Sequence, residues 1–591
     1  MLRKTLIGLG LGMSALVGVS CNSVITSGEG TCPPEQTNCD PQNPGGMTPT
    51  EMTTGVGPGG GGGGGGTVPF DPKGDGSIGV SVDPNGNIIL DPTAGTSTQS
   101  SVIWVANSGD GTVSKIDTRT RKQLARYKTL PGTVNSDPSR TTVSLGGDVA
   151  VANRSWTNGA DGNNGSVIKI AGDKGNCVDR NGNGRIDTYE GEATTIPAPF
   201  NTWTNGQPSP DECVLWLTMT NTNSAGTVMM TRPRAAGWDG EITDTSLSQY
   251  LYVGLFDTSE VLRLDGATGR IVKRINVAPT QPYGLALDKN GNVWVMGRES
   301  NTGTLAKIEV KNPTQPDLVK RYTPAAGCNY GITVDPRGLV YHAFNSCLAR
   351  FDPVAEKYEY LTVPGSNQLR GLGIDNKYNL WVADSNVGVH HVDVSALPPA
   401  TGTSMVHRQS IATAGTNAGV GIDFDNKTWV VSYNGNSSHA YQINPGAQAG
   451  QATLEFTYNS ANTGALNNSY MYSDMTGYQL RNASRAGTFR TTFQGCPNGN
   501  TTWTNLNYSV SAPRGTKVSI RYRGAATTAE LTNSPWTTAS GTSPVPISVT
   551  VPMGQTPRYL QVEVTMTSVD ASLTPVLSGL SAGYTCMQII G

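Results

Sequence analysis

The chain has 591 residues with a formal net charge of −2, only 15% charged residues and 73 glycines. This length suffices for several domains, or for one large repeat fold with an accessory domain. Because there is no basic surplus, nucleic acid and anionic membrane surfaces are not expected as partners. Low charge with abundant Gly, Thr, Asn and Ser is typical of an extracellular all-β protein.

The first 21 residues resemble a bacterial lipoprotein signal. Residues 1–4 are basic, and residues 5–20 form an apolar stretch too short to span a bilayer. Cys21 follows and is expected to become the lipidated N-terminus, the only contact with a membrane. Gly18 stands where the lipoprotein pattern has Leu, so an ordinary secretory signal cut near Ser20 stays an alternative. Both alternatives predict export, and the first predicts a lipid anchor in the outer membrane or at the cell surface.

The nine cysteines indicate a disulfide framework. Setting Cys21 aside leaves an even number, and export to an oxidising compartment makes disulfides their expected use. No Cys-x-x-Cys motif indicates redox or thiolate–zinc chemistry. Connectivity does not follow from sequence alone, but neighbours along the chain offer these local pairs: Cys32 with Cys39, Cys177 with Cys213, Cys328 with Cys347, and Cys496 with Cys586.

Residues 22–75 are expected to form a flexible tether. They are rich in Gly, Pro and Thr, and they include an uninterrupted glycine run at 59–66. Such a composition cannot bury a core.

Residues 76–446 contain a repeated sequence motif. In each copy Asp follows Gly by four positions and an aromatic residue follows Asp by six, and the glycines are 47, 40 and 48 residues apart. An apolar strand, a turn of Asp, Asn or Gly, and a second strand make a β-hairpin. Units of about 40–50 residues with four strands each are typical of a β-propeller. The copies are Gly284, Asp288 and Trp294; Gly331, Asp335 and Tyr341; Gly371, Asp375 and Trp381; and Gly419, Asp423 and Trp429.

Counting the aromatic or apolar anchor strands predicts seven blades, with six or eight as alternatives. Residues 79–90 contain the first part of the same motif and are expected to form a strand that closes the ring against the last blade. Over residues 98–446 these motifs resemble the repeats in the propellers of the virginiamycin B lyase-like, YVTN and NHL repeat families. For a virginiamycin B lyase-like enzyme, the resemblance implies a histidine and acidic metal ligands at one mouth. No stretch here matches that family's histidine/glutamate motif.

Residues 451–591 predict a β-sandwich, jelly-roll-like in type. Strict alternation at 453–458, 517–522 and 559–565 marks half-buried strands, and no helical period is sustained. The segment resembles the C-terminal sandwiches of other bacterial surface propellers. Its aromatic residues either line a carbohydrate-binding face or form the core: Tyr470, Tyr472, Tyr478, Trp503, Tyr508 and Trp536.

The sharpest local motif is a calcium-loop pattern at residues 179–190, matched at seven positions. The flanks are not helical, so we expect a lone loop in an insertion at about 173–213, between the second and third blades. Ca²⁺ there would stabilise the fold, and the alternative is an Asn/Gly-rich turn without an ion. The expected ligands are side-chain oxygens of Asp179, Asn181 and Asn183, the Arg185 carbonyl, Asp187 through water, and a bidentate Glu190.

The histidines do not form a recognisable catalytic set. His342 is a candidate to face the central channel, and of the adjacent His390 and His391 on another blade's strand one is expected to face inward and the other outward. Nucleophile-elbow, zinc-protease and phosphate-loop motifs are missing from the sequence, and the repeated aspartates are interpreted as turn residues. No catalytic or cofactor-binding residue is therefore predicted.

Three functions remain open. The first is an exported, surface-anchored, non-enzymatic binding or scaffold protein for a polysaccharide or protein ligand. The second is a virginiamycin B lyase-like lyase acting in the channel, and the third is carbohydrate binding by the sandwich. Converging histidines and carboxylates in the channel favour an enzyme, whereas an apolar or Asn/Thr-lined channel favours binding.

Overall fold

The computed structural model describes residues 65–69, 71–72, 74–77, 79–91 and 102–587. Within the last range it leaves out 133–134, 155–164, 194, 223–224, 240–249, 299–302, 311–315, 326, 436–437, 460–464, 484, 498–499, 514–515, 552–553 and 569–572. The predicted signal, most of the tether, the lipidation site Cys21 and the pair Cys32–Cys39 lie outside the described residues. In the part of the chain that is described, no helix is long and apolar enough to cross a membrane.

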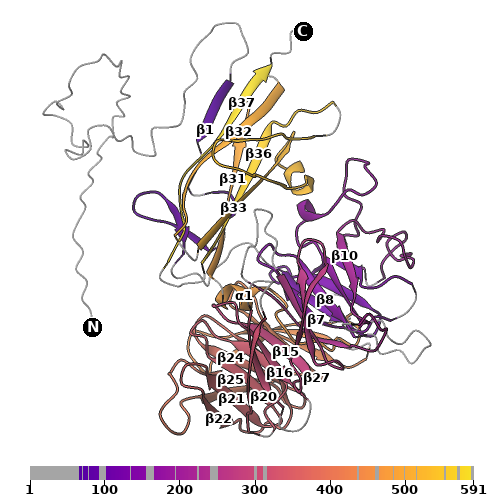
Figure 1. Ribbon diagram of the computed structural model, residues 1–591, viewed down its shortest axis with the longest axis vertical. Helices are drawn as coiled ribbons and strands as arrows, with labels where there is room; N and C mark the ends of the chain where they lie inside the picture. Colours follow the sequence, from indigo (N-terminus) through magenta and orange to yellow (C-terminus); the bar gives the residue numbers. More distant parts are fainter. Residues whose placement is uncertain are drawn as a thin grey trace, which may run out of the picture. The chain divides into compact units, whose positions relative to one another are not determined.

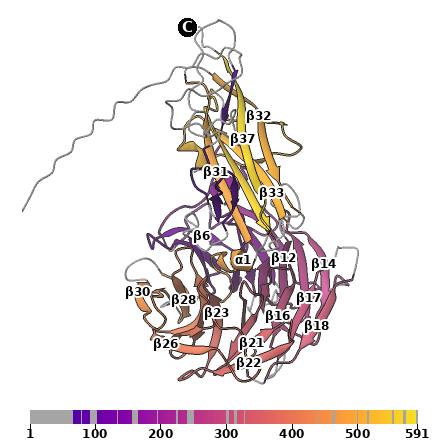
Figure 2. The same cartoon turned by 90° about the vertical axis from the view of Figure 1, so that its left-hand side faces the viewer.

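Residues 102–476 form a seven-bladed propeller of antiparallel sheets (Figures 1 and 2). Six blades have four strands each, ordered as in the sequence, and the first strands of neighbouring blades contact one another around the axis. The first strands are β7 (Pro138–Val143), β11 (Pro233–Trp238), β15 (Pro282–Leu287), β19 (Gly331–Val334), β23 (Leu369–Ile374) and β27 (Thr416–Ile422).

The other three strands of each blade lie progressively farther from the axis. The second strands are β8 (Val149–Asn153), β12 (Tyr250–Leu255), β16 (Val293–Gly297), β20 (Val340–Phe344), β24 (Asn379–Asp384) and β28 (Thr428–Tyr433). The third strands are β9 (Ser166–Ile170), β13 (Glu260–Asp265), β17 (Leu305–Glu309), β21 (Cys347–Asp352), β25 (Gly388–Asp393) and β29 (His439–Asn444). The outermost strands are β10 (Val214–Met219), β14 (Ile271–Asn276), β18 (Leu318–Tyr322), β22 (Lys357–Thr362), β26 (Val406–Ala412) and β30 (Thr453–Tyr458).

The remaining blade is closed by a segment from the other end of the ring. Its own strands are β4 (Val102–Asn107), β5 (Thr112–Asp117) and β6 (Gln123–Lys128), and residues 466–476 occupy the place of its first strand. There the Trp104 N–H donates to the Met475 carbonyl at 3.0 Å, and the Gly109 N–H donates to the Asn467 carbonyl at 3.0 Å. The expectation that residues 79–90 close the ring is therefore wrong.

Crowding at the axis explains the repeated glycines. A Cβ at Gly331 would lie 2.2 Å from the Arg370 carbonyl oxygen, and one at Gly371 would lie 2.5 Å from that of Ala418. Because backbone atoms set these distances, no larger side chain fits without moving a strand.

The repeated aspartates are turn residues, as predicted, and each also holds the next strand. Asp423 Oδ1 accepts the N–H groups of Asp425 and Lys427, and its Oδ2 accepts the Trp429 indole N–H at 2.8 Å. Asp288 makes the same contact with Trp294 at 2.9 Å. In these two blades one carboxylate therefore serves both the hairpin turn and the buried tryptophan six residues later.

The rest of the chain forms a sandwich of two antiparallel sheets with a core between them. In β36 (Tyr559–Ser568) the alternating Leu560, Val562, Val564 and Met566 are fully buried, at about 1.5–3 kcal/mol each. That sheet also contains β31 (Arg485–Gln494), β33 (Thr516–Ala525) and β34 (Thr537–Thr538). The other sheet contains β1 (Gly65–Pro69), β2 (Val80–Val82), β3 (Ile88–Leu90), β32 (Asn500–Ser511), β35 (Val545–Pro546) and β37 (Val576–Met587).

Two predicted boundaries need correction. Strands β1 to β3 pair within the sheet of β37, so the chain enters the sandwich before the propeller and returns to it afterwards. The segment 453–458, predicted as a sandwich strand, is the outermost strand of the last blade, because its alternation fits any sheet with one covered face. Short helices complete the fold: α1 (Tyr478–Ala483), η1 (Lys174–Asn176) and η2 (Glu530–Asn533).

Three of the expected disulfides are present, Cys177–Cys213, Cys328–Cys347 and Cys496–Cys586. Disulfides persist in oxidising surroundings, so they indicate an extracellular or periplasmic protein.

Candidate functional site

One mouth of the propeller collects arginine and aromatic side chains from several blades. The first and second strands of a blade are antiparallel, so the first strand starts on the side of the propeller where the second strand ends. Residues at the starts of first strands therefore meet residues at the ends of second strands around the axis. The first group supplies Arg140, Arg234, Tyr283, Tyr330 and Arg370, and the second supplies Arg154, Phe256, Arg298, Phe344 and Tyr433. The closing segment adds Tyr470 and Tyr472; we call these twelve residues the arginine–aromatic mouth.

A hydrogen-bonded tyrosine cluster forms the centre of the mouth. The Tyr283 and Tyr470 hydroxyls are 2.9 Å apart, and the Tyr470 hydroxyl also contacts that of Tyr330. Arg234 Nη1 donates to the Tyr283 hydroxyl at 3.0 Å, and Arg370 Nη1 donates to that of Tyr330 at 2.7 Å. Tyr283 and Tyr330 are buried, whereas Tyr470 is half-buried and reaches the surface.

The guanidinium groups of Arg140, Arg298 and Arg370 lie on ring faces, whereas that of Arg154 also pairs with Asp137. Arg140, 1% exposed, lies 3.5 Å from the ring centroid of Tyr472. Half-buried Arg298 lies 4.8 Å from the ring centroid of Tyr330 and 4.6 Å from that of Phe344. Among the described residues no ion pair joins Arg140, Arg298 or Arg370 to a carboxylate. The mouth therefore carries excess positive charge, held by cation–π contacts.

That charge acts on the phenols beneath it. Burial disfavours ionisation of Tyr283, but Arg234 and Arg140 outweigh burial and hold the pKa of Tyr283 well below its usual range. Burial raises the pKa of Tyr330 and of Tyr472 instead. The arginine charges therefore favour the ionised form at Tyr283, whereas burial keeps Tyr330 and Tyr472 neutral.

A polar cleft of about 470 Å³ adjoins the mouth. Arg154 and Arg234 belong to both the cleft and the mouth, and Arg154 lies 4.6 Å from the ring centroid of Tyr470. Two wall residues have left-handed backbone, Asp137 with φ of 49° and Asn468 with φ of 45°. Backbone strain of this kind is common where a site has to be held in a fixed shape. The cleft is lined by Ser108, Gly109, Asn135, Asp137, Arg154, Arg234 and Asn468.

The channel below the mouth is narrow and apolar. Its free volume is about 10 Å³, less than one water molecule needs. It is lined by Arg140, Tyr472 and Ser473 together with glycine, alanine, leucine and isoleucine residues of the first strands. A second pocket along the first strands is lined by Asp474 and Gln479 as well as apolar residues, and its volume of about 20 Å³ likewise leaves no room for a substrate.

The histidines lie within the blades and not in the channel lining. His342 is buried in β20, its Nδ1 contacts the Cys328 carbonyl, and burial lowers its pKa to about 4. His391 stacks on Trp381 at 4.6 Å, and burial lowers its pKa to about 4 as well. The expectation that His342 faces the channel is wrong.

His390 lies between an aspartate and a serine without forming a catalytic relay. Its Nδ1 is 2.9 Å from the hydroxyl of exposed Ser410, but its Nε2 is 3.7 Å from Asp384 Oδ2, too far for a hydrogen bond. Asp384 instead accepts backbone N–H groups of its own turn, including that of Asn386. The burial of His390 makes it part of the blade core.

The predicted calcium loop is ordered, and it brings four of its six expected ligand residues together. The amide nitrogens of Asn181 and Asn183 each lie 2.8 Å from Asp187 Oδ2, and Asp179 accepts the N–H groups of Gly182 and Gly184. Rotating the two amides by half a turn would present their oxygens at the same point. The donor set therefore suits Ca²⁺, which prefers such oxygens.

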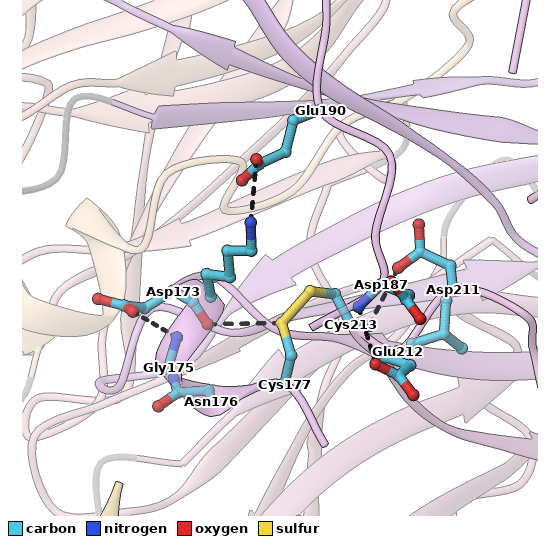
Figure 3. Close-up of a disulfide and its surroundings, with 12 residues drawn as sticks. Asp173, Gly175, Asn176, Cys177, Asp187, Glu190, Asp211, Glu212 and Cys213 are labelled. Atoms are coloured by element: carbon cyan, nitrogen blue, oxygen red, sulfur yellow. Dashed lines mark hydrogen bonds and ion pairs between the residues drawn. A yellow bond between two sulfur atoms is a disulfide. The ribbon is translucent and has the colours of Figure 1, made fainter. Parts of the chain in front are cut away.

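The structure does not bring Glu190 to that point. Glu190 is exposed and pairs with Lys174 at 3.2 Å, and Figure 3 shows it well apart from Asp187. The Arg185 guanidinium pairs with Asp187 at 3.0 Å. Buried Glu212 fixes the loop instead, accepting the N–H groups of Arg180 and Asp187 (Figure 3). No group of three or more His, Cys, Asp or Glu side chains in a metal-binding arrangement occurs among the described residues.

The six aromatic residues proposed for a sandwich face do not form one. Tyr470, Tyr472 and Tyr478 belong to the propeller's closing segment and to α1, and Trp503 is buried in the sandwich core. Trp536 lies under the guanidinium groups of Arg521 and Arg523, at 4.5 and 4.2 Å. Tyr508 is half-buried and donates to the Gly541 carbonyl. The six residues therefore do not share one face of the sandwich.

Sequence reasoning missed the arginine–aromatic mouth, although a signal was present. Tyr283, Tyr330 and Arg370 each stand immediately before a repeated glycine, at Gly284, Gly331 and Gly371. In a first strand this position precedes the axial crowding and points to the mouth. The mouth was missed because each blade places a different residue there.

Comparison with known proteins yields likenesses of fold at low identity. No family model and no curated protein matches the chain. Among solved structures, a protein from Lactobacillus plantarum is 12% identical with a TM-score of 0.42, over 63% of this chain and 97% of that one. A streptogramin B lyase is 11% identical with a TM-score of 0.37, over 62% and 93%. A catalytically inactive virginiamycin B lyase from Staphylococcus aureus, with quinupristin, is 12% identical with a TM-score of 0.36, over 62% and 95%.

Proposed function

We propose that the protein is an exported, non-enzymatic binding protein, anchored through Cys21, that holds its ligand at the arginine–aromatic mouth. The carrying observation is the gathering of guanidinium groups and half-buried rings around an open cleft, above a channel too narrow to admit a substrate. Arginine and aromatic residues dominate binding sites because they bury large areas and make directional contacts. The positions of the histidines, inside the blades, favour binding over the lyase alternative.

The test compares the wild-type protein with Arg298→Ala on an array of soluble polysaccharides and peptides. Arg298 contacts rings only, so its removal opens the mouth without breaking an ion pair among the described residues. We expect at least one ligand to bind the wild type and to lose about tenfold or more in affinity on Arg298→Ala. Arg408→Ala, on an outer strand of another blade, is the matched control.

Two results would count against the proposal. Ligands whose affinity is equal for Arg298→Ala and the wild type would place binding elsewhere on the molecule. Chromatography of a bound ligand after overnight incubation with equimolar protein should recover it unchanged, and a shortened or eliminated product would restore the lyase alternative.

A further inference from the structure

The polar groups of the cleft and the rings of the mouth are of the kinds that bind carbohydrates, and the arginines of the mouth favour a ligand with negative charge. Sugar hydroxyls are recognised by planar amide, carboxylate and guanidinium groups. The cleft wall offers such groups at Asn135, Asp137, Arg154 and Asn468. In the adjoining mouth, the rings of Phe256, Phe344 and Tyr433 are half-buried, so part of each remains available. An apolar peptide pocket would lack this polar lining.

The guanidinium groups add the preference for an anion. Arg298 lies against the rings of Tyr283, Tyr330 and Phe344 and donates no side-chain hydrogen bond to any described residue. Its fork is therefore free to bind a carboxylate or sulfate in two-point fashion. Buried Arg140 spends its donors on the carbonyls of Ser139 and Arg234, so its charge adds to the field without contacting the ligand.

We propose that the ligand is an acidic saccharide, whose ring lies in the polar cleft and on the aromatic rim while its carboxylate or sulfate binds Arg298. The inference rests on the proposed function and names the ligand class for the same site. Asp137 does not oppose it, because its carboxylate is paired with Arg154. Arg234 extends the positive field into the cleft, 3.0 Å from the Tyr283 hydroxyl.

The experiment uses two matched pairs of polymers with the folded full-length mature chain. Polygalacturonate and its fully methyl-esterified form share a backbone and differ in the carboxylate, and dextran sulfate and dextran differ in the sulfate. We expect one charged polymer to bind and its neutral partner to bind at least about tenfold more weakly, since a hydrogen bond to a charged group is lost. The pair that responds identifies the carboxylate or the sulfate as the recognised group.

Variants separate this inference from the proposed function. Arg298→Gln should weaken binding of the charged polymer about tenfold or more, Arg298→Lys should recover part of it, and Arg408→Gln should leave it unchanged. Equal affinity for charged and neutral polymers, with the Arg298 effect retained, would overturn the acidic ligand class and leave mouth binding standing. Failure of both charged polymers to bind would also overturn the inference, while the wider array still tests mouth binding. Binding of a charged polymer that Arg298→Gln leaves intact would overturn both.

Discussion

At the scale of single residues, the buried carboxylate of Asp423 makes the folding stability of the protein depend on pH. Burial raises its pKa to about 6, although the Trp429 indole and two backbone N–H groups favour the charged form. The pKa in an unfolded chain is about 3.9, so the neutral form is the one that folding favours. The stabilising contribution is complete below about pH 4 and is lost as the pH rises through about 6.

We therefore expect the stability of the wild type relative to Asp423→Asn to fall by about 2–3 kcal/mol between pH 4 and pH 7. The variant cannot ionise at this position, so subtraction isolates the one group. Urea unfolding followed by circular dichroism gives the midpoints. Asp265→Asn, in a hairpin turn of another blade, is the control, and a difference that stays constant with pH would refute the assignment.

The sequence predicted the structural role of Asp288 and Asp423 because an aspartate recurs at the same position of each repeat. It did not predict Tyr330 or Arg298, because a site at the axis needs different side chains from different blades. Periodicity identifies what every blade shares. Function at a mouth depends on what each blade does differently.

At the scale of elements, the loop at 179–190 can be tested as a calcium site. Four of its expected ligand residues converge, whereas Glu190 pairs with Lys174. With about 5 mM Ca²⁺ and an affinity in the range of extracellular modules, the expected stabilisation is about 1–2 kcal/mol, visible as a rise in melting temperature over protein in chelator. Asp187→Asn should abolish the rise, and Glu190→Gln should preserve it.

Two other outcomes of that titration are informative. No heat of binding and no thermal shift would mean an Asn/Gly-rich turn without an ion. Loss of the shift in Glu190→Gln would mean that the loop rearranges to bring this carboxylate in. The motif predicted the loop from residue types alone, but it could not predict the Glu190–Lys174 pair, because Lys174 lies outside the pattern.

At the scale of the whole molecule, the domain boundaries are set by strands that pair with partners far away in the sequence. Sequence composition does not reveal such pairing. Residues 466–476 complete the first blade, and strands β1 to β3 complete the sandwich. Each of these segments pairs with a partner hundreds of positions away, as the 365-residue separation of Ala106 and Met471 illustrates. Local alternation predicted a strand in each domain but not its partner.

A pair of fragments tests this closure. A fragment ending at residue 446, the predicted propeller boundary, lacks both β30 and the closing segment, whereas one ending at residue 483 keeps them. With both starting at residue 98, we expect only the longer fragment to unfold cooperatively on heating, because the shorter one exposes the inner edge of β4. Equal cooperativity would show that 466–476 is dispensable.

The position of the propeller within the sandwich sequence has a mechanical consequence. The chain runs through β1, β2 and β3, then through all the blades, and then back into β31. A pull on the chain before residue 65 is therefore borne first by the pairing of β1 with β37, from Gly65 opposite Thr585 to Pro69 opposite Ser581. A ligand pulling at the mouth is resisted through two chain connections, one on each side of the ring. Tension between the N-terminal segment and a ligand at the mouth therefore passes through the sandwich before it reaches the blades, and the β1–β37 pairing is the first contact to bear that load.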